Sequence, residues 1–198
     1  PDDLLRLHEE SRLIDGSVDP IEIAEHQSLS LRLDLAGNDM NGVVGWRARH
    51  HAGIIDVDKP DNYDPADFWE PVSARGGGII LNPDDFYILA TREAVTVPPD
   101  YAAEMVAYDT LVGEFRVHYA GFFDPGFGWD PKNVAVGSRG VLEVRSHDVP
   151  FLLEHEQVIG RLRYERLTAR PEKIYGSGIG SHYQGQGLKL AKQFKIPD

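Results

Sequence analysis

The fold class of this chain is decided by residues 114–128, which read EFRVHYAGFFDPGFG. Between residues 115 and 123, apolar or small residues alternate with Arg116 and His118. This period of two predicts a β-strand with one face toward a core. The Asp-Pro-Gly sequence at 124–126 predicts a tight turn directly after that strand.

Similar strand signals, separated by turn residues, recur through most of the chain. Clusters of Gly, Pro, Asn and Asp follow one another roughly every ten residues, which is typical of a β-sandwich or barrel. The further predicted strands are 28–35, 79–81, 86–90, 94–97, 141–144 and 158–164. We therefore expect an all-β fold.

Three other segments carry different signals. A short helix is predicted at 2–10, with Gly16 as a candidate C-cap. An Asp- and Pro-rich segment at 50–70 predicts a long ordered loop held by aromatic side chains. The Gly- and Gln-rich segment from 175 to 194 has no clear periodicity, and it predicts a mobile tail or a lid.

The chain of 198 residues carries a formal net charge of −12. Such a protein is poorly suited to nonspecific binding of nucleic acid or of an anionic membrane, because both are negatively charged. A small phosphorylated ligand remains compatible, since a few local cations or a bound metal ion can outweigh the global field. No apolar run reaches the ~18 residues of a membrane span. No signal peptide is evident, so we expect a cytoplasmic protein without nucleic-acid or membrane partners.

The residue inventory does not indicate metal or thiol chemistry. There is no cysteine, which excludes disulfides, thiolate nucleophiles and the Cys-ligated zinc of zinc deaminases. His50 and His51 are adjacent, and the remaining histidines lack the i, i+4 spacing of helical zinc sites. Gly76–Gly78 precede a predicted strand rather than a helix, so they favour a flexible turn over a phosphate-binding loop. We therefore predict no zinc site.

Four segments, in this order along the chain, resemble motifs of the dCTP deaminase and dUTPase superfamily. Residues 86–101 resemble its strand pair, and residues 120–127 resemble the A-x-x-x-D-P-G-[WF] turn of the substrate pocket. Residues 140–144, GVLEV, resemble the strand that carries the pocket Glu. Residues 175–187 resemble the C-terminal lid.

The resemblance covers about residues 78–190 and implies a fold for the whole chain. We expect a dUTPase-like distorted jelly-roll, or β-clip barrel, with a short N-terminal helix. It would form a single domain over residues 1–198, with 175–198 as a C-terminal lid or tail.

The resemblance also implies roles for individual residues. Glu143 is implied as the catalytic residue. The implied substrate contacts are Ala120, Asp124, Phe127, Val141, Leu142, Tyr175, His182 and Gln186. Asp124 would accept a hydrogen bond from the 3′-hydroxyl, and Phe127 would stack against the sugar or base, while Tyr175 and Gln186 would reach the phosphates. The alternatives are an Asx turn for Asp124, core packing for Phe127 and a disordered tail for the other two.

Hydrolytic deamination at C4 of cytosine needs a nucleophilic water and a proton for the leaving amino group. Without a metal, one buried carboxyl group can supply both in turn. Glu143 lies on an apolar predicted strand between Leu142 and Val144, and we expect it to be buried there. The alternative is that alternation turns Glu143 toward solvent, or toward Arg139 or Arg145.

One motif of the superfamily is missing from this chain. The phosphate-binding R-S-S-x-x-x-R stretch should fall near residues 106–111, which contain no arginine, and His182 replaces the lid Lys. Such a chain resembles one half of a double-length deaminase, whose other half supplies the phosphate-binding motif. The resemblance implies a homo-oligomer, either a trimer or a pseudo-trimer. It also implies that Mg²⁺ arrives on the nucleotide triphosphate rather than in a protein site.

Three functions remain open from the residues. The first is the deamination of dCTP to dUTP and ammonia. The second is a dUTP pyrophosphatase, in which Asp124 would direct water at phosphorus. The third is a non-catalytic half that completes a trimer-like core, which the missing arginines favour.

Overall fold

Strands make up most of the computed structural model, which describes residues 2–38, 40–107, 115–117, 121–130, 137–176, 185 and 187–195. The described helices are α1 (Asp2–Ser11), α2 (Pro20–His26) and α3 (Pro65–Phe68). The described strands are β1 (Leu29–Arg32), β2 (Gly45–Ala48), β3 (Trp69–Val72), β4 (Gly78–Leu81), β5 (Phe86–Val95), β6 (Tyr101–Ala107), β7 (Phe115–Val117), β8 (Phe122–Phe123), β9 (Ser138–Ser146), β10 (Phe151–Glu154) and β11 (Val158–Arg166).

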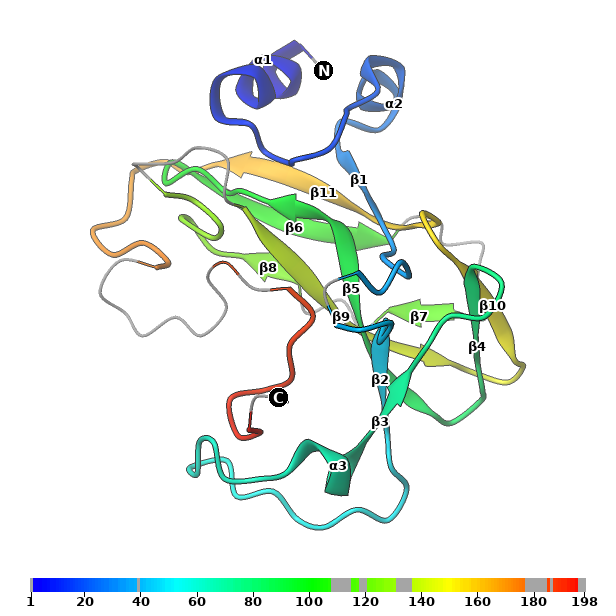
Figure 1. Cartoon of the computed structure of the whole chain (residues 1–198). Coiled ribbons are helices and arrows are strands. Elements are labelled where there is room, and N and C mark those ends of the chain that lie inside the picture. The colour runs from blue at the N-terminus through cyan, green and yellow to red at the C-terminus, as the bar shows by residue number, and fades with distance from the viewer. Residues whose placement is uncertain are drawn as a thin grey trace.

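These strands form three antiparallel sheets. A five-stranded sheet has the order β3-β2-β5-β9-β7, a four-stranded sheet has the order β1-β11-β6-β8, and β10 pairs with β4. Figure 1 shows α1 and α2 together at one end of the molecule, and α3 at the opposite end near the C-terminal segment. The all-β prediction is confirmed, because the helices lie at the ends of the molecule and the sheets form its body.

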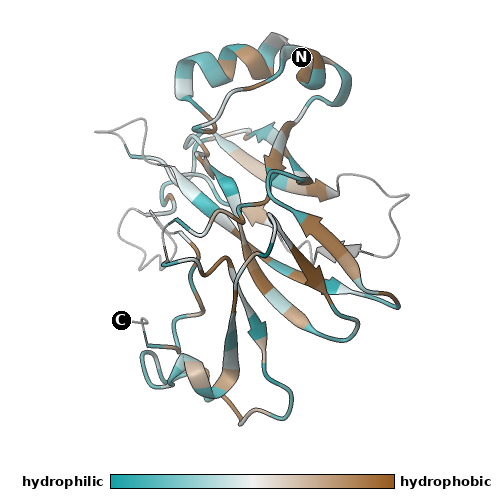
Figure 2. Ribbon diagram, turned by 45° about the vertical axis from the view of Figure 1, so that its right-hand side comes forward, coloured by the Kyte–Doolittle hydropathy of each residue, from teal (hydrophilic) through white to brown (hydrophobic). Residues whose placement is uncertain are grey.

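The main hydrophobic core lies where the three sheets face one another. Leu142 and Val144 of β9 point into it and are each 1% exposed. Leu31 and Leu162 of the four-stranded sheet and Leu153 of β10 belong to the same cluster. Figure 2 shows hydrophobic segments on several of the strands, next to hydrophilic ones.

A second hydrophobic cluster, here called the outer cluster, covers part of the other face of the five-stranded sheet. Trp46 of β2 and Ile88 of β5 are buried in it together with Leu190 and Phe194 of the C-terminal segment. Phe194 also forms a parallel bridge with Tyr63, in the loop before α3. Residues 187–195, which belong to the predicted tail or lid, thus pack against residues far away in the sequence.

The structure contains short elements that the sequence patterns did not predict, namely α2, α3, β2, β3, β6 and β10. Asp19 and Pro20 were a usable signal for α2, since the Asp19 carboxylate accepts the Ile21 N–H at 2.9 Å and Pro20 opens the helix. The strands β2 and β3 have only four residues each, which is too short for a clear alternation. The predicted loop at 50–70 therefore contains α3 and part of β3.

Two predicted boundaries are wrong for local backbone reasons. The two strands predicted at 86–90 and 94–97 are one strand, β5, whose register against β9 shifts between Ala90 and Ala94. The helix α1 ends at Ser11 rather than at Gly16, because Arg12 already has a left-handed backbone with φ of 42°.

Candidate active site

Strand β9 carries the predicted catalytic residue on the face away from the main core. The residues on this outer face of β9 are Arg139, Val141, Glu143 and Arg145. Glu143 lies directly opposite Ile88 of β5, which belongs to the outer cluster. The Glu143 side chain is nevertheless exposed, so its predicted burial is wrong for this chain by itself. Strand alternation turns Leu142 and Val144 into the core instead.

The Asp-Pro-Gly turn lies beside the Ser138 end of the same strand. The Phe127 N–H donates to the Asp124 carbonyl at 3.0 Å and so closes the turn. At Gly128, whose φ is +65°, a Cβ would come within 2.8 Å of the Ser138 nitrogen. Only glycine therefore allows the turn to approach β9 this closely.

Phe127 fills the core under this turn. It is 7% exposed, and its ring centroid lies 5.0 Å from that of Phe123 and 5.6 Å from that of Tyr175. The Tyr175 N–H donates to the Pro125 carbonyl at 2.7 Å, which fixes the start of the C-terminal segment on the turn. In the single chain, Phe127 is thus a packing residue, while the side chain of Asp124 is exposed.

The C-terminal segment also returns to the Ser138 end of β9. The Gly185 N–H donates to the Ser138 hydroxyl at 2.6 Å. Tyr175 and Gly185 therefore contact neighbouring parts of the same site. Three predicted substrate contacts, namely Ala120, His182 and Gln186, lie outside the described residues.

The described candidate site residues lie at two places along β9. Asp124, Phe127 and Tyr175 lie near Ser138, whereas Glu143 lies further along the strand. Val141 lies between them on the outer face and is partly buried against the outer cluster. Leu142 points into the main core, so only its backbone can line this face.

A bulge in β5 supports this part of β9, and the sequence patterns did not predict it. Between Ala90 and Ala94, β5 has extra residues opposite Gly140. Thr91, which is fully buried, accepts the Gly140 N–H at 2.8 Å and donates to the Glu93 carbonyl at 2.8 Å. A Cβ on Gly140 would lie only 3.2 Å from the Thr91 methyl group. Glycine at this position is the sequence signal of that close approach.

Charged pairs hold the bulge in place. The Glu93 carboxylate is buried and accepts the backbone N–H of Arg32 at 2.7 Å and its guanidinium at 3.1 Å. On the outer face, Arg139 forms an ion pair with Asp34, whose N–H donates to the Ala90 carbonyl at 3.0 Å. Arg139, which the sequence suggested only as a partner for Glu143, is instead paired with Asp34.

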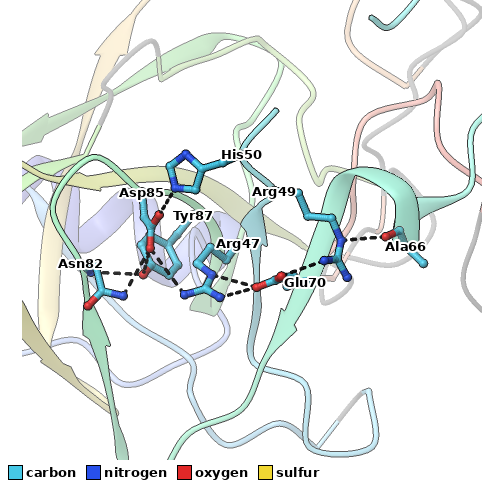
Figure 3. A network of polar contacts seen from close by, with 8 residues as sticks. All are labelled: Arg47, Arg49, His50, Ala66, Glu70, Asn82, Asp85 and Tyr87. Atoms are coloured by element: carbon cyan, nitrogen blue, oxygen red, sulfur yellow. Dashed lines mark hydrogen bonds and ion pairs between the residues drawn. The ribbon is translucent and has the colours of Figure 1, made fainter. Parts of the chain in front are cut away.

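A different polar network lies at the end of β2 and β3 (Figure 3). Arg47 pairs with Glu70 and lies 3.5 Å from Asp85. Asp85 also accepts the Tyr87 hydroxyl at 3.1 Å and contacts His50 Nε2 at 2.8 Å. Burial opposes ionisation of Asp85, but its hydrogen bonds and the charge of Arg47 together lower the pKa of its carboxyl group.

This network borders a cavity of about 500 Å³ between β3 and β4. Arg47 and Tyr87 line its polar side, and Ile80 and Leu152 line its apolar side. None of the described candidate residues lines this cavity. The network connects β2, β3 and the turn before β5, and its member Tyr87 pairs with Val144, the neighbour of Glu143 on β9.

Two further observations concern the described part of the chain. No group of three or more His, Asp or Glu side chains there lies close enough together to hold a metal ion. None of the described helices is both long and apolar enough to cross a membrane.

Comparison with known proteins identifies a family. Residues 1–194 match the family model described as 2′-deoxycytidine 5′-triphosphate deaminase, C-terminal domain. The solved structure of 2′-deoxycytidine 5′-triphosphate deaminase from Agrobacterium tumefaciens is 53% identical, with a TM-score of 0.74. The match covers 84% of this chain and 48% of that chain. This likeness confirms the predicted superfamily fold.

Two relatives are described as dCTP deaminase, dUMP-forming. The protein of Halobacterium salinarum is 35% identical over 193 residues, which cover 93% of this chain and 91% of the relative. The protein of Beutenbergia cavernae is 35% identical over 114 residues, which cover 54% of this chain and 53% of the relative. The chain thus spans about half the length of the solved protein and of the second relative.

Proposed function

Because this chain belongs to the family of C-terminal domains of 2′-deoxycytidine 5′-triphosphate deaminases, we propose that it provides the base pocket of a dCTP deaminase. The reaction is dCTP plus water giving dUTP plus ammonia. The observation that carries the proposal is the 53% identity to a solved deaminase over 84% of this chain. The enzyme would act in the cytoplasm on a nucleotide pool.

Glu143 would be the acid–base residue of this reaction. Its carboxylate takes a proton from a water molecule, and the resulting hydroxide attacks C4 of the cytosine ring. The carboxyl group then returns the proton to the amino group, which leaves as ammonia, while the proton of the added hydroxyl moves to N3 as the C4 carbonyl of uracil forms. Asp124 would accept a hydrogen bond from the 3′-hydroxyl of the sugar.

The proposal requires that another part of the assembly covers the outer face of β9. The Glu143 side chain is exposed in the single chain, whereas proton transfer by a carboxyl group is most effective where bulk water is excluded. A trimer or pseudo-trimer would supply this cover. The same neighbour would supply the arginines and serines that residues 106–111 lack.

The metal requirement follows from the substrate. Mg²⁺ would bind the triphosphate and not a protein cage. After EDTA has removed the Mg²⁺, the addition of excess Mg²⁺ should therefore restore full activity. Elemental analysis of the purified protein should find no zinc, and one zinc ion per chain would overturn this metal-free mechanism.

A second candidate function is a coupled reaction that ends at dUMP. It is favoured by the Halobacterium salinarum relative, which matches along 93% of this chain and is described as dUMP-forming. In that reaction a second water attacks dUTP and releases pyrophosphate. Asp124 would be the carboxylate that directs this water.

Incubating the full-length gene product separately with dCTP and dUTP, and resolving the products by chromatography, tests these functions. Accumulation of dUTP and ammonia from dCTP supports deamination alone. Formation of dUMP from dCTP supports the coupled reaction. Hydrolysis of dUTP without any reaction of dCTP would identify a pyrophosphatase, and no turnover of either would identify a non-catalytic assembly.

A further inference from the structure

The bulge in β5 divides β9 into two parts that have different neighbours. Three residues of β5, 91–93, lie opposite Gly140 alone, because the register between the two strands shifts there. Before Gly140, the start of β9 approaches the Asp-Pro-Gly turn at Ser138. After Gly140, the regular pairing with β5 resumes and includes Glu143. A bulge bends a strand and increases the local twist, so this bulge sets how the two parts of β9 are oriented relative to each other.

The Thr91 hydroxyl joins the bulge to β9. Thr91 is fully buried, and its Oγ1 accepts the Gly140 N–H at 2.8 Å while donating to the Glu93 carbonyl at 2.8 Å. Because the single hydroxyl proton is committed to Glu93, the oxygen presents a lone pair to Gly140. A Cβ on Gly140 would also lie 3.7 Å from the ring of Phe123, which packs on Phe127 of the turn. Thr91, Gly140 and the turn are therefore linked by direct contacts.

The four-stranded sheet fixes the bulge from its other side. Leu33, which follows β1, forms an antiparallel bridge with Thr91. The buried Glu93 carboxylate accepts the backbone N–H of Arg32, the last residue of β1, at 2.7 Å. A bulge held in this way resists rearrangement. Loss of the Thr91 hydroxyl should therefore leave the Gly140 N–H without its acceptor and shift β9 locally.

The two parts of β9 serve different parts of the proposed nucleotide. Phe127 places the turn against the main core, whereas Glu143 is exposed on the outer face of β9. A nucleotide can contact Asp124 of the turn and Glu143 together only if the two parts of β9 keep a fixed relative orientation.

We propose that Thr91 is a positioning residue of the nucleotide site, which acts through Gly140 to hold the Asp124 turn and the Glu143 strand at a spacing that one nucleotide bridges. This inference rests on the proposed function, which assigns the base to Glu143 and the 3′-hydroxyl to Asp124. Because Thr91 is fully buried, it contacts no substrate atom itself. Its loss should therefore affect the selection of nucleotides that carry a 3′-hydroxyl.

Three variants of the full-length protein separate this role from a general contribution to stability. Thr91→Val keeps the shape of the side chain and removes the hydroxyl, whereas Thr91→Ser keeps the hydroxyl. Ser146→Ala is the matched control, because Ser146 is buried and its hydroxyl donates to the Val149 carbonyl. Like Gly140, Ser146 lies three residues from Glu143 on β9, but on the side away from the turn.

Binding is measured by calorimetry in a Glu143→Gln background, so that the nucleotides stay intact during the titration. The ligands are dCTP and 2′,3′-dideoxycytidine triphosphate, which lacks the 3′-hydroxyl. A hydrogen bond to a carboxylate should make the parent prefer dCTP roughly 10- to 100-fold. In Thr91→Val this preference should fall to about threefold or less, while Thr91→Ser and Ser146→Ala keep the preference of the parent.

A double variant tests whether Thr91 acts through the turn. Asp124→Ala alone should remove the preference for dCTP. Adding Thr91→Val to Asp124→Ala should then leave the ratio of the two affinities unchanged, because the contact that Thr91 positions is already absent. If the Thr91→Val protein fails to fold, Thr91→Ala takes its place with the same expectations.

Equal weakening of the two nucleotides in Thr91→Val would overturn the proposal, because it would mean a general distortion of the site. A parent without any preference for dCTP, or a Ser146→Ala protein that loses the preference, would overturn it as well. If Thr91→Val loses the preference but the wild-type protein does not deaminate dCTP, the positioning role stands and the proposed reaction fails. If the wild-type protein does not bind dCTP, both fail.

Discussion

The two faces of β9 differ in burial and in residue type, although their residues alternate along one strand. The inner face carries Leu142 and Val144, which are each 1% exposed and pack among residues from all three sheets. The outer face carries Val141 and the exposed Glu143, and it is covered in part by the loop before α3 and the C-terminal segment. The inner face stabilises the fold, and the outer face carries the proposed catalytic residue.

The largest effect is expected from the outer face, in activity and not in stability. Glu143→Gln should abolish deamination, because an amide keeps the shape of the side chain but cannot shuttle a proton. Nucleotide binding should stay within about tenfold of the parent, and the unfolding midpoint should hardly change because the side chain is exposed. Steady-state assays with dCTP measure the activity, and a thermal melt measures the unfolding midpoint. Near-normal turnover would falsify the assignment of Glu143 as the catalytic residue.

The inner face should respond in the opposite way. Leu142→Ala should reduce the free energy of unfolding by about 2–5 kcal/mol, because it leaves a cavity in the main core. Val141→Ala, one residue away on the other face, should cost roughly 1 kcal/mol or less. Urea unfolding of the two variants compares the two faces directly. Equal losses of unfolding free energy would mean that the two faces of β9 do not differ in their contribution to stability.

The cover of the outer face can be loosened without disturbing the core. Phe194 is 6% exposed and contacts the rings of Tyr63, Phe68 and Trp69. Phe194→Ala should destabilise this cluster locally by roughly 1–3 kcal/mol. Hydrogen exchange should accelerate at the Asn62 amide, which donates to the Gln193 carbonyl.

The matched control for this measurement is the β5–β9 pairing within the same sample. Its amides should exchange at the parent rate, because the core between the sheets is intact. Acceleration of both regions together would show that the C-terminal segment and the core unfold as one unit.

The smallest effect is expected at the polar network of Figure 3, and it depends on pH. The pKa of Asp85 is lowered in the folded protein, so its carboxylate stabilises the fold above the unfolded value of about 3.9. That contribution is lost as the pH falls through the lower, folded value. Asp85→Asn should cost roughly 1 kcal/mol at pH 7. The difference in unfolding free energy between this variant and the wild type should shrink in strong acid. Urea unfolding at pH 7 and in strong acid measures this difference. An equal difference under the two conditions would mean that the charge of Asp85 is unimportant.

Sequence patterns predicted the inner face well because it depends on local periodicity. The strand at 141–144 needed only alternation, and the turn at Asp124 needed only its Pro and Gly. The superfamily resemblance then indicated Glu143 and Asp124 as functional residues. The turn at Asp124 contacts Tyr175, and Glu143 lies opposite Ile88, which packs in one cluster with Leu190 and Phe194.

The remainder depended on contacts that no local pattern encodes. The exposure of Glu143 is an exception, because strand alternation already places Glu143 opposite Leu142 and Val144. The Arg139–Asp34 pair and the Thr91–Gly140 contact join residues that are far apart in the sequence. The outer cluster depends in the same way on the approach of Phe194 to Tyr63.

The late arrival of the C-terminal segment has a consequence for the synthesis of the protein on the ribosome. Gln193 Nε2 donates to the carbonyl of Val57, a residue 136 positions earlier in the chain. At about 5–20 residues per second, the ribosome needs roughly 7–27 seconds to make the intervening stretch. From the synthesis of Ile88 until that of Leu190 and Phe194, Trp46 and Ile88 lack their cover, so the nascent chain exposes a hydrophobic surface to which a chaperone can bind.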